Sequence, residues 1–166
     1  MSVIGKFYGG IGALIWSPEL ERYLLLRRSA AKDYGAGAWE CVTGRVDQGE
    51  GFEEALHREV MEELGVRVEV MAILGTTHFY RGAPLPENEL IGVVFLCTLD
   101  DPESIHIGPE HSELRWLSAD EVLQTLDAHD PTTRWARRLI ARGEIIRKLV
   151  PNELANFYQS AGVETG

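Results

Sequence analysis

The chain has 166 residues, 45% of them hydrophobic and 25% charged, and a formal net charge of −10. This composition is ordinary for a soluble globular protein, and we expect one domain over residues 1–166, with a core over about 7–126 and C-terminal helices over about 130–160. The acidic balance argues against long nucleic acids, because duplex binding needs basic surface to replace counterions. A small phosphorylated partner is compatible, since its charge can be met locally.

The sequence also predicts a cytoplasmic protein with no membrane partner. No apolar run approaches the length of a membrane span, and residues 1–6 lack the basic start and apolar core of a secretory signal. Cys41 and Cys97 lie in apolar segments and form no CxxC pair, so we expect two reduced core thiols. Both a monomer and a homodimer are compatible with these features.

Hydrophobic patterning predicts strands alternating with helices along the chain. The predicted strands cover residues 7–16, 22–28, 39–42, 66–78, 89–99 and 113–117. Helices are predicted over 52–64, from the Ser118 cap to about Leu126, from the Asp130-Pro131 cap to about Arg142 before Gly143, and after Pro151. Residues 79–88 form a predicted loop that borders the substrate. The alternation indicates an α/β protein whose mixed sheet is covered by helices on both faces.

The segment from Gly44 to Val66, GRVDQGEGFEEALHREVMEELGV, carries most of the chemical information. In a helix over 52–64, Glu59, Glu62 and Glu63 stand at positions i, i+3 and i+4 and share one face. Carboxylates so placed repel one another, and a divalent cation removes the conflict. Oxygen ligands without His or Cys suit Mg²⁺ or Mn²⁺.

Two other residues of this segment, Arg58 and Glu50, are placed to orient or extend the group of carboxylates. Arg58 points about 100° away from Glu59 on the helix, so we expect it to reach the preceding loop or to orient a carboxylate through a bidentate bond. Glu50 ends a glycine-rich loop and can add a fourth carboxylate, and the glycines can turn carbonyl oxygens toward a metal. Zinc is not expected, because the histidines show no zinc-ligand spacing: His57, His78, His106, His111 and His129.

The spacing G-x5-E-x7-R-E-U-x-E-E-x-G-U, in which U is apolar, is that of the Nudix box, and the chain resembles the Nudix hydrolases at every constrained position. The resemblance implies an α/β/α sandwich with a mixed β-sheet and extends roughly over residues 9–126. It also implies a metal-dependent pyrophosphohydrolase. The functional residues it implies are the metal ligands Gly44 (through its carbonyl), Glu59, Glu62 and Glu63, supported by Glu50 and Arg58.

Residues outside the box are candidates for the rest of the site. A general base can come from a loop carboxylate, and Glu110 lies in a turn directly before the last predicted strand; the alternative is a solvated acid. Arg28 stands where many family members carry a phosphate-contacting arginine. Trp39 and Tyr80 are candidate stacking surfaces for a planar base, or else core aromatic residues.

Substrate choice depends mostly on residues outside the box. The sequence W-x-x-V-T-G at 39–44 is similar to that of bacterial dihydroneopterin triphosphate pyrophosphatases. We therefore predict Mg²⁺-dependent cleavage of a phosphoanhydride in a small nucleoside- or pterin-type polyphosphate. The alternatives are a dinucleotide polyphosphate or nucleotide-sugar pyrophosphatase and, from another class, a non-catalytic nucleotide-sensing module. The complete set of box carboxylates argues against the sensing module.

Overall fold

The computed structural model describes residues 4–32 and 34–166. The prediction that residues 1–6 form no secretory signal falls partly on residues 1–3, which lie outside the described residues. The strands that the structure describes are β1 (Tyr8–Ser17), β2 (Arg22–Arg28), β3 (Trp39–Glu40), β4 (Val42–Arg45), β5 (Glu69–Tyr80), β6 (Glu89–Thr98) and β7 (His111–Leu117). The helices are α1 (Phe52–Leu64), α2 (Ala119–Thr125), α3 (Pro131–Leu149) and α4 (Asn152–Ala161), with short 3-10 turns at Pro86–Asn88 and Pro102–Ser104.

All of these strands belong to one mixed sheet. Its order is β3-β2-β1-β6-β5, while β4 pairs with β1 and β7 pairs with β2. The β1 and β6 strands run parallel, and the other pairs are antiparallel. Their central place explains their near-continuous apolar sequences, because a strand covered on both faces has no solvent side.

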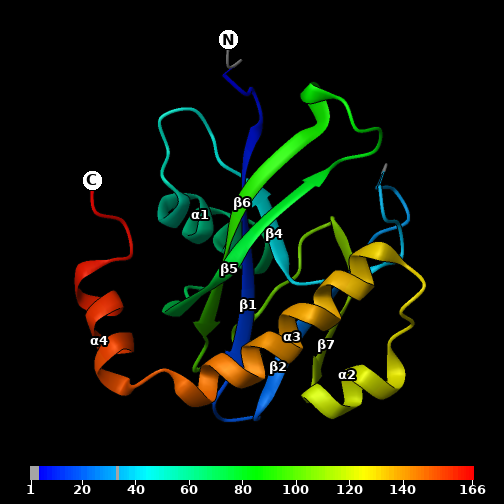
Figure 1. Ribbon diagram of the computed structural model, residues 1–166. Coiled ribbons are helices and arrows are strands. Elements are labelled where there is room, and N and C mark those ends of the chain that lie inside the picture. Colours follow the sequence, from blue (N-terminus) through cyan, green and yellow to red (C-terminus); the bar gives the residue numbers. More distant parts are fainter. Residues whose placement is uncertain (1–3, 33) are drawn as a thin grey trace.

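Helices cover both faces of this sheet (Figure 1). Alternate residues of β1 point to opposite sides, so that Ala13 and Ile15 enter one core cluster while Leu14 and Trp16 enter the other. The first cluster is closed by the apolar stripe of α1 and the second by α2 and α3. A fourth helix, α4, packs along β5. The predicted α/β/α sandwich with a mixed sheet is confirmed.

The α1 helix has the predicted bounds, and its ends are fixed by glycines. At the N-terminus, the Gly51 amide donates to Glu54 Oε2 at 3.1 Å. At the C-terminus, Gly65 adopts a left-handed conformation with φ of 69°, which ends the helix because a residue with a Cβ is strained there. Between them, Ala55, Leu56 and Val60 are buried against the sheet.

The predicted end of α3 is wrong. The helix continues through Gly143 to Leu149 instead of stopping at about Arg142. Gly143 is buried, and a Cβ on it would lie 2.8 Å from Leu14 Cδ2, so this glycine permits close packing of the helix on β1. The adjacent Glu144 accepts a hydrogen bond from Tyr23 Oη at 2.8 Å, which ties the second half of the helix to the sheet.

Several strand bounds also differ from the prediction. The predicted strand over 39–42 divides into β3 and β4, the strand predicted over 66–78 begins three residues later and extends to Tyr80, and the last strand begins at His111. The longer β5 pairs with β6 up to the register Tyr80↔Glu89, so the predicted loop at 79–88 is shortened. In the described part of the chain, no helix is both long enough and apolar enough to cross a membrane.

Candidate active site

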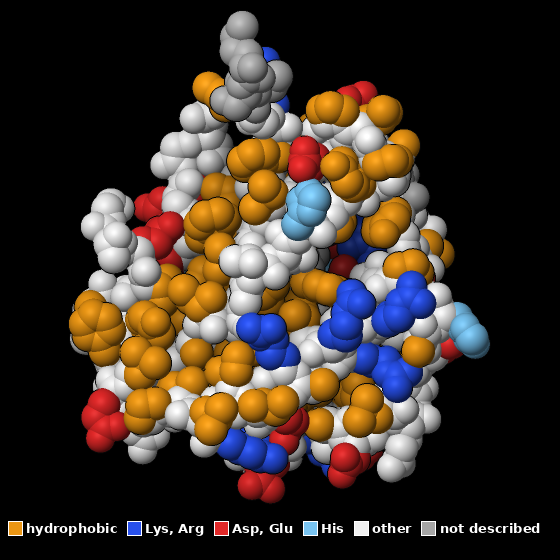
Figure 2. All heavy atoms as spheres, in the orientation of Figure 1, with side chains coloured by type: hydrophobic (Ala, Val, Ile, Leu, Met, Phe, Trp, Pro, Cys, Tyr) orange, Lys and Arg blue, Asp and Glu red, His pale blue; other side chains and the backbone are white. Residues whose placement is uncertain are grey.

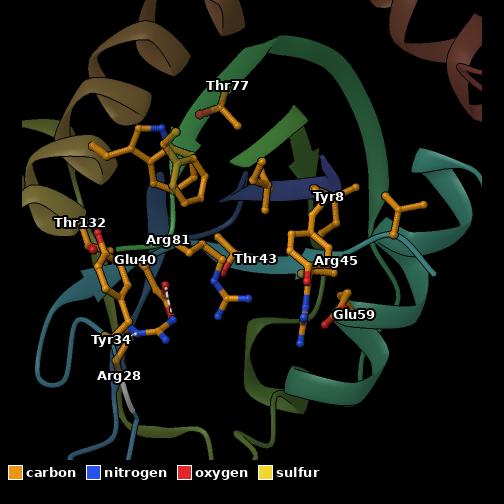
Figure 3. Close-up of a pocket in the computed structure, with 18 of the residues that line it drawn as sticks. Tyr8, Arg28, Tyr34, Glu40, Thr43, Arg45, Glu59, Thr77, Arg81 and Thr132 are labelled. Carbon is orange, nitrogen blue, oxygen red and sulfur yellow. Dashed lines mark hydrogen bonds and ion pairs between the residues drawn. The ribbon is translucent and has the colours of Figure 1, made fainter. Parts of the chain in front are cut away.

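A pocket of about 680 Å³ opens at one end of the sheet (Figure 3). One wall, here called the box wall, is formed by residues 43–48 of β4 and the following loop together with Glu59 and Glu63 of α1. The opposite wall, here called the helical wall, is formed by residues 77–81 of β5 and its loop together with Pro131, Thr132, Trp135 and Arg138 of α3. The pocket therefore joins the Nudix-like segment to a helix about ninety positions later in the chain.

Arg58 holds the box wall together. Its Nε and Nη2 donate to the two carboxylate oxygens of Glu50 at 2.8 and 2.9 Å, Nη1 donates to Glu59 Oε1 at 2.9 Å, and Nη2 also donates to the Arg45 carbonyl at 2.8 Å. This arrangement confirms that Arg58 reaches the preceding loop through a bidentate bond. The hydrogen bonds from Arg58 lower the pKa of Glu50 to about 2, so Glu50 is ionised at neutral pH.

The three box glutamates are placed differently. Glu59 and Glu63 line the pocket, whereas the Glu62 side chain is 60% exposed and lies 3.4 Å from Arg58 Nη1. Glu63 is buried, and its Oε2 has no hydrogen-bond partner among residues 4–32 and 34–166. Burial raises the pKa of Glu59; burial, together with the charges of Glu40 and Glu59, raises that of Glu63 to about 9. Two partly desolvated carboxylates, one with an unpartnered oxygen, form an environment that a cation stabilises.

Gly44 brings the backbone of β4 against this pair. A Cβ at Gly44 would lie 2.0 Å from Glu59 Cδ, so a larger residue here would displace the Glu59 carboxylate. Among residues 4–32 and 34–166, no three acidic, His or Cys side chains already converge as a metal cluster. The oxygens of Glu59, Glu63 and the Gly44 carbonyl nevertheless match the hard-donor chemistry of Mg²⁺.

A network of three polar side chains, Arg28, Glu40 and His111, lies next to Glu63. Glu40, only 3% exposed, accepts two hydrogen bonds from Arg28 Nη1 at 2.8 and 2.9 Å, and its Oε1 lies 3.1 Å from His111 Nε2. The other ring nitrogen of His111, Nδ1, is 3.9 Å from Glu63 Oε2. Arg28 lines the pocket, as expected for a phosphate ligand, but one of its nitrogens is committed to Glu40. Sequence reasoning missed Glu40, although a lone acid within the apolar run Trp39–Val42 was the available signal.

Two of the remaining candidates line the pocket, and one does not. Glu110 lines the pocket and pairs with Lys32, whose hydrogen bond lowers the pKa of the Glu110 carboxyl. Tyr80 lines the pocket as well. Trp39 is not among the lining residues; it packs on the second core cluster, and the Arg115 guanidinium lies 4.8 Å from its ring centroid.

The aromatic residue that does face the pocket from α3 is Trp135, which sequence reasoning missed. A Cβ on Gly12 would lie 3.4 Å from its ring, so the absence of a side chain at Gly12 leaves the face of the sheet open beneath Trp135. The available signal was its position beside the apolar stripe of α3, whose buried members are Ala136, Leu139 and Ile140.

Three arginines supply cationic groups around the pocket. Arg45, Arg81 and Arg138 line it, and within the described residues none of them forms an ion pair with a carboxylate. Figure 3 shows Arg45 beside Glu59, while the Arg81 side chain extends into the middle of the pocket. Carboxylates on one wall, with one arginine beside them and two more on the opposite wall, are typical of a hydrolase site for a small phosphorylated compound.

Comparisons with known proteins identify the family. The family model described as the NUDIX domain matches residues 6–142, and the chain belongs to this family of pyrophosphohydrolases. It is 29% identical over 117 residues to the nucleoside triphosphatase NudI of Enterobacter sp. (strain 638), covering 66% of this chain and 82% of that protein. It is 30% identical over 125 residues to the NAD-capped RNA hydrolase NudC of Mycobacterium tuberculosis, covering 75% of this chain but only 37% of that relative's length.

A solved structure agrees with this assignment. The MutT protein from Methanosarcina mazei Go1 superposes with a TM-score of 0.68 at 29% identity, and the match covers 89% of this chain and 99% of that one. The family match over residues 6–142 includes the first part of α3 as well as the box.

Proposed function

We propose that the protein hydrolyses a phosphoanhydride bond in a small nucleoside polyphosphate, with Mg²⁺, or Mn²⁺ in its place, as the resident cation. The observation that carries this proposal is the pair of partly desolvated carboxylates, Glu59 and Glu63, in a pocket of about 680 Å³ that three arginines also line: Arg45 on the same wall and Arg81 and Arg138 on the opposite one. None of the three forms an ion pair among the described residues. A pocket of this volume falls within the usual range for small-molecule sites.

In this proposal the box wall holds the cation, and the helical wall together with Arg45 of the box wall holds the substrate. Glu59, Glu63 and the Gly44 carbonyl, with Glu62 after rotation, bind the cation, while Glu50 and Arg58 keep Glu59 in place. The bound cation would acidify a water molecule and shield the phosphoryl charge.

The other pocket residues divide substrate binding and proton transfer among themselves. Arg45 and Arg81 bind phosphate oxygens, and Trp135 and Tyr80 flank the base. Glu110 accepts the proton of the attacking water, and Lys32 keeps its carboxylate in the ionised form that a base requires.

The experiment that tests this proposal is a substrate panel. The purified protein is incubated with Mg²⁺ or with EDTA and with nucleoside triphosphates, dihydroneopterin triphosphate, dinucleoside polyphosphates and nucleotide sugars, and the products are separated by chromatography. Hydrolysis in ¹⁸O-labelled water identifies the phosphorus atom that is attacked. We expect Mg²⁺-dependent turnover of at least one compound. Mg²⁺-dependent binding without any product would replace the hydrolase with the nucleotide-sensing module.

A further inference from the structure

A second hollow continues from the active-site pocket along α3. It has a volume of about 520 Å³ and lies between α3 and the β5 and β6 strands. The two hollows share Thr77, His78, Trp135 and Arg138, so the second begins where the helical wall of the first ends. We call this second hollow the α3 groove. A ligand that starts beside Glu59 and Glu63 can extend into it past Trp135 without leaving the surface.

The α3 groove combines an aliphatic floor with a cationic rim. Leu74, Val94 and Leu139 are buried and form its floor, whereas Arg138 and Arg142 are the charged groups that line it. No acidic side chain is among its lining residues within the described chain. The active-site pocket, in contrast, carries acids and bases together.

The charge of α3 is unusual for this chain. Its sequence PTTRWARRLIARGEIIRKL has six Arg or Lys residues and one Glu, although the whole chain has a net charge of −10. Figure 2 shows Lys and Arg side chains gathered over this helix, next to exposed hydrophobic side chains. Arg142 is held in place because its Nε donates to the Leu74 carbonyl at 2.6 Å, while Arg138 forms no ion pair among the described residues.

We propose that the α3 groove binds the second nucleoside phosphate of a two-unit substrate, such as a dinucleoside polyphosphate, whose bridging phosphates lie between Glu59 and Arg138. This inference rests on the proposed function. The apolar side chains that remain accessible in the groove, Ile145 and Trp135, contact a ribose and base, and the two arginines bind the phosphate attached to them. A nucleoside triphosphate has no anionic group to place there, because its base and phosphates occupy the active-site pocket alone.

Ile145 provides a selective test because it lines only the α3 groove and is 61% exposed, so replacing it leaves the core intact. Leu149 is a matched control on the same helix: it is 74% exposed, lies one turn later and lines neither hollow. Each position is replaced once by an acidic and once by a basic residue: I145E and I145K in the groove, L149E and L149K outside it. A change of net charge alone should affect both positions equally, whereas an effect on phosphate binding in the groove should appear only at Ile145.

The variants are compared by KM and by calorimetric binding, with diadenosine tetraphosphate as the two-unit probe and ATP as the one-unit probe. We expect I145E to weaken diadenosine tetraphosphate binding about fivefold and I145K to strengthen it, because a single charge near an exposed phosphate has an effect of this order. ATP should respond less than twofold, and both Leu149 variants should behave like the wild type. Equal responses to the two probes, or no response at Ile145, would overturn the groove assignment.

The same experiment distinguishes this inference from the proposed function. Absence of turnover for every compound in the substrate panel would refute the hydrolase, yet a charge-dependent difference in diadenosine tetraphosphate binding would still support the groove. Normal turnover together with identical binding by I145E and I145K would refute the groove and leave the hydrolase intact.

Discussion

The two walls of the pocket differ in how their charges are held. On the box wall, Arg58 bonds to Glu50, Glu59 and the Arg45 carbonyl, so its charged groups fix one another in place. On the helical wall, Arg81 and Arg138 form no ion pairs within the described chain, and both are exposed. The ion-paired cluster around Arg58 has the fixed geometry that a catalytic step needs. The exposed arginines of the helical wall are instead free to bind an anionic substrate.

The walls also differ in how the chain builds them. The box wall comes from one segment of about twenty residues, in which a glycine-rich turn leads directly into α1. The helical wall needs the end of β5 and the first half of α3, which are distant in sequence and meet because α3 packs on the sheet that contains β5. Changes on the box wall should therefore affect turnover, and changes on the helical wall should affect affinity.

The largest expected effect is that of Glu63→Gln. Removing this carboxylate should lower kcat by about a hundredfold or more, because the proposed cation loses a buried ligand. The melting temperature in EDTA should not fall, because the variant removes a buried carboxylate whose Oε2 has no hydrogen-bond partner in the described part of the chain. The exposed Glu103→Gln serves as control and should leave both quantities unchanged. Wild-type kcat in Glu63→Gln would remove Glu63 from the site.

The sequence predicted the box wall well for a physical reason. The i, i+3, i+4 spacing of the glutamates and the glycines at each end of α1 are local features, and their geometry follows from the helix itself. The orientation of Glu62 away from the pocket did not follow from spacing alone, because Arg58 competes for that carboxylate. The structure therefore shows what helix periodicity does not: Arg58 contacts Glu62 and draws its carboxylate away from the pocket.

The helical wall was poorly predicted because its determinants are not local. Gly143 looks like a helix stop in the sequence, and only its contact with Leu14 shows that the helix needs a small residue there. Trp39 and Trp135 are both partly buried against the second core cluster. The position of Trp135 beside the apolar stripe of α3 places it next to the sheet but does not show that it also lines the pocket. Tertiary packing decides both cases.

A second prediction uses these two tryptophans directly. Trp135→Leu should raise the KM for a nucleotide substrate about tenfold with little change in kcat, since base stacking contributes about 1–3 kcal/mol. Trp39→Leu is the matched control: it should lower the melting temperature through lost packing against the core and Arg115 but leave KM unchanged. The reverse pattern would place the base on Trp39, the residue that the sequence alone suggested.

The smallest predicted effect concerns Glu50 and is measured as the melting temperature at two pH values. The bidentate bond to Arg58 lowers the pKa of Glu50 in the folded protein from 4.5 to about 2. A lowered folded-state pKa contributes stability that is complete above the unfolded value and is lost as the pH falls toward the folded value. Glu50→Gln should therefore melt a few degrees below the wild type at pH 7, and this difference should shrink by pH 3.

Glu103→Gln is again the control and should melt like the wild type at both pH values. A difference between Glu50→Gln and the wild type that is the same at pH 7 and pH 3 would show that the ionised form of Glu50 is not what stabilises the box wall. In that case its role would reduce to the hydrogen bond that its Oε2 accepts from the Asp47 amide at 2.9 Å, which a glutamine oxygen can also accept. The pH dependence thus separates an ionic anchor for Arg58 from a neutral turn contact.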